Sequence, residues 1–326
     1  MNIYPNTACG TFCTWILANS NIRVTPQRKI QIQNVQTAAN SGSYVTLLYY
    51  ESFVAYTYRF YGSYLQFQAL QPNAPSPTTQ DALTTAWLAV VSNPAQQTIY
   101  AVDAFFKQLR ADGNLLFDYC FLFAQDQQAN AKIDLMNPTL YSITEHNTPT
   151  WTANQGYTGN GTNMYLSANY IESVNANNWT NNSSIYGAYG RVAGGAADKW
   201  IMGTSGTVIS SAMVVRYTDN NMYGHNDDTT AVSKPNTNTQ GLFLSQRTAS
   251  NVQQIWANGV SLGTGSTASG ALINKNDYFL AYNNNGAPAG YDTNQIALAL
   301  KGSGAVNPIT LNSAVNLLMT NLGAHY

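Results

Sequence analysis

Carboxylates are the side chains of this 326-residue chain that could act most directly as acids, bases or nucleophiles. Retaining hydrolysis of a glycosidic bond needs two carboxyl groups about 5–5.5 Å apart. The chain has three glutamates, Glu51, Glu145 and Glu172, and none is near another in the sequence. The adjacent acids Asp227 and Asp228 would alternate across a strand or lie in a loop. We therefore predict that the protein is not an enzyme, and a glycosidase would need a site shared between chains.

Candidate metal ligands are few. The cysteines, Cys9, Cys13 and Cys120, are odd in number, and no second Cys or His pair completes a zinc site with Cys9 and Cys13. Calcium prefers carboxylate and amide oxygens, but the acid- and amide-rich stretch 219–228 does not have the spacing of an EF-hand loop. We expect no cofactor, with calcium as the alternative, and its candidate ligands are Asp219, Asn220, Asn221, Asn226, Asp227 and Asp228.

Aromatic side chains offer a different chemistry, the binding of sugars. Sugars present apolar C–H faces that pack on Trp and Tyr rings, while amides and hydroxyls bond to the sugar hydroxyls. A turn-rich part of the sequence combines such rings with many Asn and Thr residues. Each ring could instead belong to the core of a domain, and that alternative stays open. The candidate glycan-binding residues are Trp179, Tyr186, Tyr189, Trp200, Tyr217 and Tyr223.

The charge composition excludes several classes of function. Lys and Arg number 14 against 15 Asp and Glu, so charged residues are 9% of the chain and the net charge is -1. A nucleic-acid-binding protein needs a clustered basic surface, which these scattered cations do not provide. No apolar run approaches the roughly 20 residues of a membrane span, and the first ten residues do not resemble a signal peptide. With 44% hydrophobic residues and 22 tyrosines, we expect a folded protein.

The sequence pattern divides the chain into three parts. Within residues 1–70, positions 30–35 alternate apolar and polar side chains, and the runs 44–50 and 53–64 are rich in aromatic and β-branched residues, which predicts a small β domain. Residues 71–112 contain a Pro-rich boundary and two short amphipathic helices, the first with Thr79 as a possible N-cap. Residues 113–326 contain short strand patterns separated by turns, which predicts an antiparallel sandwich. Within it, Asn258-Gly259 predicts a type I′ hairpin turn, and Thr310 could cap a closing helix.

One strand pattern of the N-terminal part is unusually rich in tyrosine, with Tyr56, Tyr58, Tyr61 and Tyr64 close together. Such a ribbon must be buried against another surface, of this chain or of a neighbouring one, and aromatic residues are enriched at protein interfaces. We predict that these four residues form an assembly interface.

Several stretches of the C-terminal part follow one another in a familiar order. They are Leu116-Phe-Asp-Tyr-Cys-Phe-Leu-Phe123, Ala131-Lys-Ile-Asp-Leu-Met-Asn-Pro138, the Gly-punctuated residues 148–162, Ile255-Trp-Ala-Asn-Gly259 and Tyr278-Phe-Leu-Ala-Tyr-Asn-Asn-Asn-Gly286. In this order they resemble the concanavalin A-like (lectin/glucanase, laminin G-like) domain of bacteriophage virion and tail proteins. The resemblance implies an all-β fold, in which an antiparallel jelly-roll sandwich follows two short helices and a small N-terminal β domain. Glycosidases of this fold carry a Glu-x-Asp-x-x-Glu pattern, which this sequence lacks.

The resemblance implies a structural protein of the phage virion, a capsid or tail appendage or fibre that is assembled in the host cytoplasm. Residues 1–70 would bind other virion proteins, the assembly would be a homotrimer, and the lectin-like domain would bind a host-surface glycan. The alternatives are a non-catalytic carbohydrate-binding protein of cellular origin and a glycoside hydrolase whose site is shared between chains.

Overall fold

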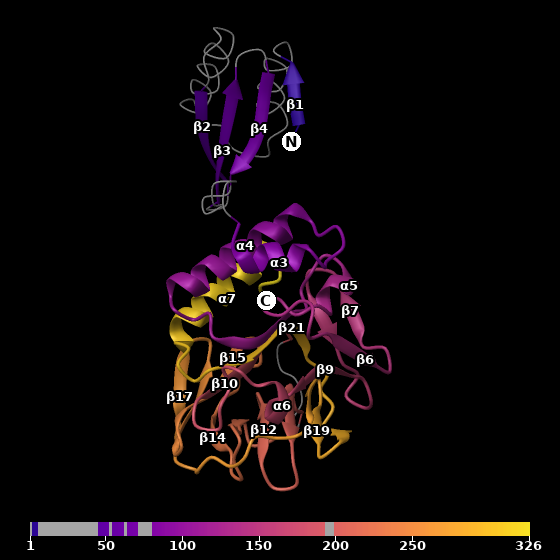
Figure 1. Cartoon of the computed structure of the whole chain (residues 1–326), viewed down its shortest axis with the longest axis vertical. Helices are drawn as coiled ribbons and strands as arrows, with labels where there is room; N and C mark the ends of the chain where they lie inside the picture. The colour runs from indigo at the N-terminus through magenta and orange to yellow at the C-terminus, as the bar shows by residue number, and fades with distance from the viewer. Residues whose placement is uncertain (1, 6–44, 52–53, 62–63, 71–79, 193–198) are drawn as a thin grey trace. The chain divides into compact units, whose positions relative to one another are not determined.

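The structure is a computed structural model that describes residues 2–5, 45–51, 54–61, 64–70, 80–192 and 199–326. It divides into two compact units, Met1–Thr78 and Thr79–Tyr326 (Figure 1). The strands of the first unit are β1 (Asn2–Pro5), β2 (Val45–Glu51), β3 (Val54–Tyr61) and β4 (Tyr64–Leu70). They form an antiparallel sheet in the order β1-β4-β3-β2.

The tyrosines of the predicted assembly interface lie in this first sheet. Tyr56, Tyr58 and Tyr61 belong to β3, and Tyr64 begins β4. Their role in assembly stays a prediction. Cys9 and Cys13 lie outside the described residues.

The second unit is built on two sheets that face each other. The first, the eight-stranded sheet, has the order β17-β16-β15-β10-β21-β8-β7, with β5 also paired to β21. Its strands are β5 (Phe117–Leu122), β7 (Thr150–Thr152), β8 (Gly156–Thr158), β10 (Ser184–Gly190), β15 (Gly241–Ala249), β16 (Val252–Ala257), β17 (Val260–Gly265) and β21 (Gln295–Gly302).

The second, the nine-stranded sheet, has the order β14-β13-β12-β11-β18-β9-β6, with β19 and β20 attached beside β11. Apart from the short parallel pair β11–β19, the strand pairs of both sheets are antiparallel. Its strands are β6 (Ile143–His146), β9 (Tyr165–Ile171), β11 (Met202–Ser205), β12 (Ser210–Val214), β13 (Asn221–Gly224), β14 (Val232–Pro235), β18 (Asn276–Phe279), β19 (Tyr282–Asn284) and β20 (Ala287–Ala289).

Three helices cover the outer side of the eight-stranded sheet: α3 (Ala82–Leu88), α4 (Gln96–Ala111) and α7 (Pro308–Leu322) (Figure 1). Two short helices, α5 (Gln128–Ala131) and α6 (Glu172–Asn175), lie in connections between strands. One apolar core joins the helices to residues such as Leu122 and Leu298, and a second fills the space between the sheets around Phe121, Tyr157 and Phe279. The unit therefore has three layers, and α3 and α4 pack within it.

The structure confirms the predicted all-β class and the antiparallel sandwich. The hairpin at Asn258-Gly259 joins β16 to β17, and both residues have the positive φ angles that a type I′ turn requires (52° and 75°). The helix caps differ from the prediction. Asp81 caps α3, and Asn307 caps α7, because Pro308 occupies the first helical position and the Asn307 carboxamide accepts from the Ile309 amide at 2.9 Å.

Asp134 ties β5 to the segment that follows α5. Its carboxylate is fully buried and accepts from the backbone amides of Cys120 at 2.7 Å, Met136 at 3.1 Å and Asn137 at 3.0 Å. Burial raises the pKa of Asp134 to about 7, although these three hydrogen bonds act in the opposite direction. The folded chain therefore holds a proton on Asp134 at pH values where the unfolded chain has released it.

We predict that the free energy of unfolding decreases as the pH rises from 5 to 7. A carboxyl group whose pKa is higher in the folded state stabilises the fold at low pH, and this contribution is lost as the pH passes the folded pKa. Asp134 alone would give a slope of at most about 1.4 kcal/mol per pH unit. Urea unfolding at several pH values measures the slope, and Asp134→Asn should make it shallower. A slope that Asp134→Asn leaves unchanged would contradict the assignment.

Candidate functional site

The outer face of the nine-stranded sheet carries a row of aromatic side chains. Side chains alternate between the two faces of a strand, and Leu166, Ala168 and Phe279 all point into the core between the sheets. Their neighbours Tyr165 and Ser167 on β9 and Tyr278 on β18 therefore point outward, where Tyr278 is paired in register with Ser167. His146 on β6 is paired with Tyr165, so the outward-facing positions of three adjacent strands meet.

We call His146, Tyr165, Tyr278 and Tyr291 the aromatic face. The His146 imidazole stacks on the Tyr165 ring with centroids 4.2 Å apart and an interplanar angle of 1°. Tyr278 and Tyr291 contact the same Tyr165 ring at centroid distances of 4.7 and 6.2 Å. Tyr165 is thus the centre of the group and is 8% exposed, while the other three rings are partly exposed and surround it.

The surroundings of the aromatic face favour the uncharged forms of His146 and Tyr165. Burial lowers the pKa of His146 from its ordinary value, and burial together with Tyr278 and Tyr291 raises the pKa of Tyr165. The Ser167 hydroxyl lies 3.1 Å from Nε2 of His146 and orients the imidazole ring. A surface of neutral rings beside hydroxyls suits a neutral ligand with apolar C–H faces.

A second pair of rings, Trp200 and Tyr282, is linked to the aromatic face through Gly290, the residue before Tyr291. Trp200 and Tyr282 contact each other with centroids 4.6 Å apart, and the Trp200 amide donates to the carbonyl of Gly290 at 2.9 Å. Gly290 has a φ of 58°, and a Cβ at this position would come within 2.1 Å of the indole. Gly290, which directly precedes Tyr291, is therefore what allows Trp200 to lie against this backbone.

Three of the six residues predicted to bind glycans do not reach the surface. Trp179, Tyr186 and Tyr189 are each at most 1% exposed. Trp179 and Tyr186 fill the core between the sheets, and Tyr189 packs under the helices. The prediction is therefore corrected for these three, because the large apolar area of each ring is used to fill the sandwich.

The other three predicted residues are partly exposed but do not form one group. Trp200 lies beside Tyr282, as described above. Tyr217 and Tyr223 contact each other at 5.4 Å, and the Tyr223 hydroxyl donates to Asp219 at 2.6 Å. Their role in binding stays a prediction, and the sequence reasoning missed all four members of the aromatic face. The alternation of Tyr165, Ser167 and Asn169 with Leu166, Ala168 and Tyr170 was a signal that could have indicated Tyr165.

The six residues proposed as calcium ligands fall into two separate places. Asp219 and Asn221 bond to each other in an exposed turn, whereas Asn226, Asp227 and Asp228 are fully buried. Asp227 accepts from Trp179 Nε1 at 2.8 Å and from the Ser211 hydroxyl at 3.0 Å. No group of three or more His, Cys, Asp or Glu side chains suited to a metal ion occurs among the described residues.

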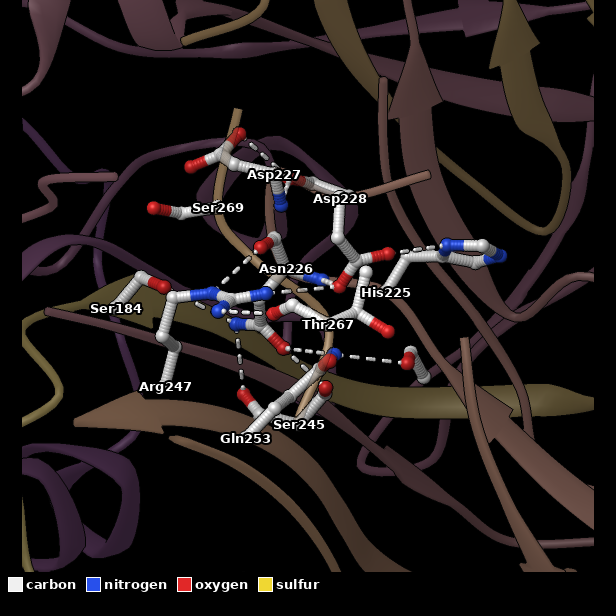
Figure 2. A network of polar contacts seen from close by, with 12 residues as sticks. Ser184, His225, Asn226, Asp227, Asp228, Ser245, Arg247, Gln253, Thr267 and Ser269 are labelled. Atoms are coloured by element: carbon white, nitrogen blue, oxygen red, sulfur yellow. Dashed lines mark hydrogen bonds and ion pairs between the residues drawn. The ribbon is translucent and has the colours of Figure 1, made fainter. Parts of the chain in front are cut away.

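Arg247 organises the buried part of this segment (Figure 2). Its guanidinium is fully buried, and it donates from Nη2 to Asp228 at 3.1 Å and from Nε to the Asn226 carbonyl at 2.9 Å. Nη1 donates to the carbonyls of Ser250 and Thr267. The other carboxylate oxygen of Asp228 lies 2.6 Å from His225 Nδ1. The planar fork of Arg thus fastens the 226–228 turn to β15, and we interpret this network as structural.

Arg247→Lys should lower the free energy of unfolding by about 3–5 kcal/mol, because an ammonium group cannot reach the four acceptors and leaves buried groups unpaired. Arg216→Lys is the matched control, since Arg216 is partly exposed and bonds to Asn220 at an exposed position. We expect that control to change stability by less than about 0.5 kcal/mol. Urea unfolding compares them, and equal effects would contradict the role given to Arg247.

A polar cavity of about 650 Å³ lies between the helices and the edge of the sandwich. Its wall formed by residues 175–178 is held by Asp118, which accepts from the backbone amides of Asn177, Asn178 and Trp179 at 2.6 to 3.1 Å. Polar side chains line it together with apolar ones such as Leu115 and Met136. The polar lining residues include Arg110, Asn137, Tyr141, Asn175, Asn177 and Asn178.

The glutamates lie in different environments. Glu51 ends β2 of the first unit. Glu145 forms an ion pair with Lys132 at 2.9 Å. Glu172 is 1% exposed between the sheets, where a single lysine, Lys301, joins it to Asp277. A close group of carboxylates therefore exists, but it lies in the interior and its members come from distant parts of the sequence.

No protein family description and no curated protein sequence matches the chain. Solved structures resemble it in backbone only. Domain 4 of an extracellular arabinanase from Geobacillus stearothermophilus, in complex with arabinotriose, is 10% identical with a TM-score of 0.45, covering 61% of this chain and 98% of that domain. The binding domain of botulinum neurotoxin serotype D is 10% identical with a TM-score of 0.44, covering 63% and 52%.

This chain thus matches about half the length of the neurotoxin domain and nearly all of the arabinanase domain. Among the described residues, no helix is both long enough and apolar enough to cross a membrane.

Proposed function

We propose that the chain is a carbohydrate-binding protein and that the aromatic face is its binding surface. The observation that carries this proposal is the neutral ring group on the outer face of the nine-stranded sheet, where Tyr278 and Tyr291 flank Tyr165. Rings of this kind pack on the C–H faces of a sugar, and the exposed Thr144 and Asn169 supply hydroxyl and amide groups on the same strands.

We propose further that the protein binds without catalysis. Glu172, Asp227 and Asp277 are each at most 1% exposed, so an external substrate would not reach them in this conformation. Glu145, which is partly exposed, is engaged by Lys132 and by the Tyr157 hydroxyl. A binding role is consistent with a surface that offers rings and amides rather than a pair of accessible carboxyl groups.

Replacement of the flanking tyrosines tests the binding surface. The full chain should bind at least one neutral oligosaccharide on a glycan array, and Tyr278→Ala or Tyr291→Ala should weaken that binding about fivefold or more, because each removes a stacking contact worth about 1 kcal/mol. Calorimetric titration with the array hit measures the change.

Tyr141→Ala is the matched control, because this tyrosine lines the cavity and not the aromatic face. If Tyr141→Ala removes binding while the Tyr278 and Tyr291 variants retain it, the cavity is the binding site and the aromatic face is not. A chain that binds no saccharide in the array or in solution would contradict the proposed function.

On the resemblance of residues 113–326 to phage proteins, we propose that the protein is a virion appendage, with residues 1–70 as its attachment domain and a host-surface glycan as its ligand. The β-rich first unit and its tyrosine-containing strands β3 and β4 are compatible with an assembly domain. A non-catalytic lectin of cellular origin remains the second candidate, since the aromatic face would serve it equally.

A homotrimer is the assembly that we propose for the appendage. Light scattering after size exclusion should give about three times the 35.4 kDa mass of one chain. Simultaneous replacement of Tyr56, Tyr58, Tyr61 and Tyr64 by Ser should yield the monomer, whereas Tyr217→Ser and Tyr223→Ser together should not. A monomeric parent protein would contradict both the trimer and the assembly role of these tyrosines.

A further inference from the structure

A lysine from one sheet reaches into the interior and meets carboxylates from the other side of the sandwich. Lys301 on β21 is 1% exposed, and its Nζ donates to both oxygens of Asp277 on β18, at 3.0 and 2.9 Å. The same Nζ donates to Oε1 of Glu172, the first residue of α6. Since Nζ is within hydrogen-bond distance of both Asp277 oxygens, it also lies close to the carboxyl carbon between them.

Aromatic rings enclose this group. The Nζ atom lies 4.4 Å from the centroid of the Trp179 ring, 5.6 Å from that of Tyr170 and 5.9 Å from that of Tyr186. The Tyr119 hydroxyl donates to Oδ2 of Asp277 at 2.9 Å. All four rings are buried, so the amine and the carboxyl groups meet in a site with little access for water.

The charges of this group do not balance if every side chain is ionised. Lys301 contributes one positive charge, whereas Glu172, Asp277 and the neighbouring Asp227 would contribute three negative ones. Burial raises the pKa of Asp277 to about 6, even though Lys301 acts in the opposite direction. Burial and Glu172 also raise the pKa of Asp227. Burial therefore favours the protonated forms of Asp277 and Asp227 in the folded protein.

We propose that Lys301 and Asp277 condense to form an intramolecular amide bond, an isopeptide cross-link, with Glu172 as the group that carries the proton. The reaction converts an ammonium group and a carboxylate into an amide and one molecule of water, so it needs no oxidant, reductant or further reactant. The folded chain holds the reacting groups in contact, so the reaction does not pay the entropy cost of bringing two molecules together.

Each proton has a defined path. Transfer of one proton from Lys301 to the Asp277 carboxylate gives a neutral amine and a neutral acid, a form that enclosure away from water favours over its population in solution. The amine then attacks the Asp277 carbon, and the hydrogen bond from Tyr119 stabilises the oxygen on which charge develops. Glu172 takes the second proton from Nζ and returns it to the departing hydroxyl, which leaves as water. The two carboxylates raise the pKa of Lys301, so the ion pair is the resting state from which this reaction starts.

The cross-link would join β18 of the nine-stranded sheet to β21 of the eight-stranded sheet. It would close a covalent loop across the interior of the sandwich, and a cross-link of this kind restricts the unfolded chain as a disulfide does. Unlike a disulfide, it would form in a reducing compartment. This inference does not depend on the proposed sugar binding.

Intact mass spectrometry of the denatured full chain tests the proposal directly. We expect a mass about 18 Da below that of the unmodified sequence, from the loss of one water. Peptide mapping should then find the peptide that contains Lys301 attached to the peptide that contains Asp277. Full sequence mass in the purified folded protein would overturn the proposal and leave an unreacted ion pair.

Four variants separate the roles. Lys301→Met and Glu172→Gln should have their full sequence masses, and Asp277→Asn should lose about 17 Da because ammonia leaves in place of water. Lys132→Met removes a partly exposed Lys–Glu pair and should keep the 18 Da deficit. A deficit that persists in Lys301→Met, or that maps to a linear peptide, would show dehydration at another place and refute the cross-link. The measurement on the parent protein decides the question even if a variant fails to fold.

Discussion

The second unit depends on one buried lysine side chain. Lys301 lies between carboxyl groups that would otherwise have no cationic partner in the interior, and its contacts reach β18 and α6 from β21. Breaking a buried pair by removing one partner typically costs about 3–5 kcal/mol, because the remaining charge stays in a medium of low polarity. Glu172 in turn accepts from the Ile273 amide at 3.1 Å, so the same cluster also positions the segment that leads into β18. The two sheets are thereby held in one specific arrangement, which apolar packing alone specifies less strictly.

Charged residues are scarce in this chain, and asparagine side chains make hydrogen bonds that hold its turns. Carboxamides both donate and accept, so one side chain can close a turn at both ends. Asn258 accepts from the Leu242 amide and donates to the Gln240 carbonyl, which fixes the β16–β17 hairpin to β15. Asn160 accepts from three successive backbone amides, those of residues 162 to 164. An amide-rich composition therefore satisfies the many turns of a sandwich without adding charge, and it is not by itself a sign of sugar binding.

The sequence predicted what depends on local periodicity. The all-β class, the turn at Asn258-Gly259 and the amphipathic helix of residues 96–111 follow from alternation, turn chemistry and helical spacing. The candidate site was predicted less well, because whether a ring lies in the core or on the surface depends on which face of a strand is covered. Trp179 lies among asparagines in the sequence and Tyr278 precedes an apolar run, yet Trp179 is core and Tyr278 faces outward. The carboxylate cluster was missed since Glu172, Asp227 and Asp277 come together only through long-range pairing of strands.

The buried cluster and the aromatic face meet on a single strand. In β18, Asp277 points inward to Lys301, and the next residue, Tyr278, points outward to Tyr165. Any force that fixes Asp277 therefore also fixes the backbone that presents Tyr278, because adjacent residues of a strand cannot move independently. A ring surface that must fit the flat face of a ligand gains affinity when it is held rigid before binding. In the proposed binding role, the interior contacts of Asp277 would hold in place a ring that the ligand contacts.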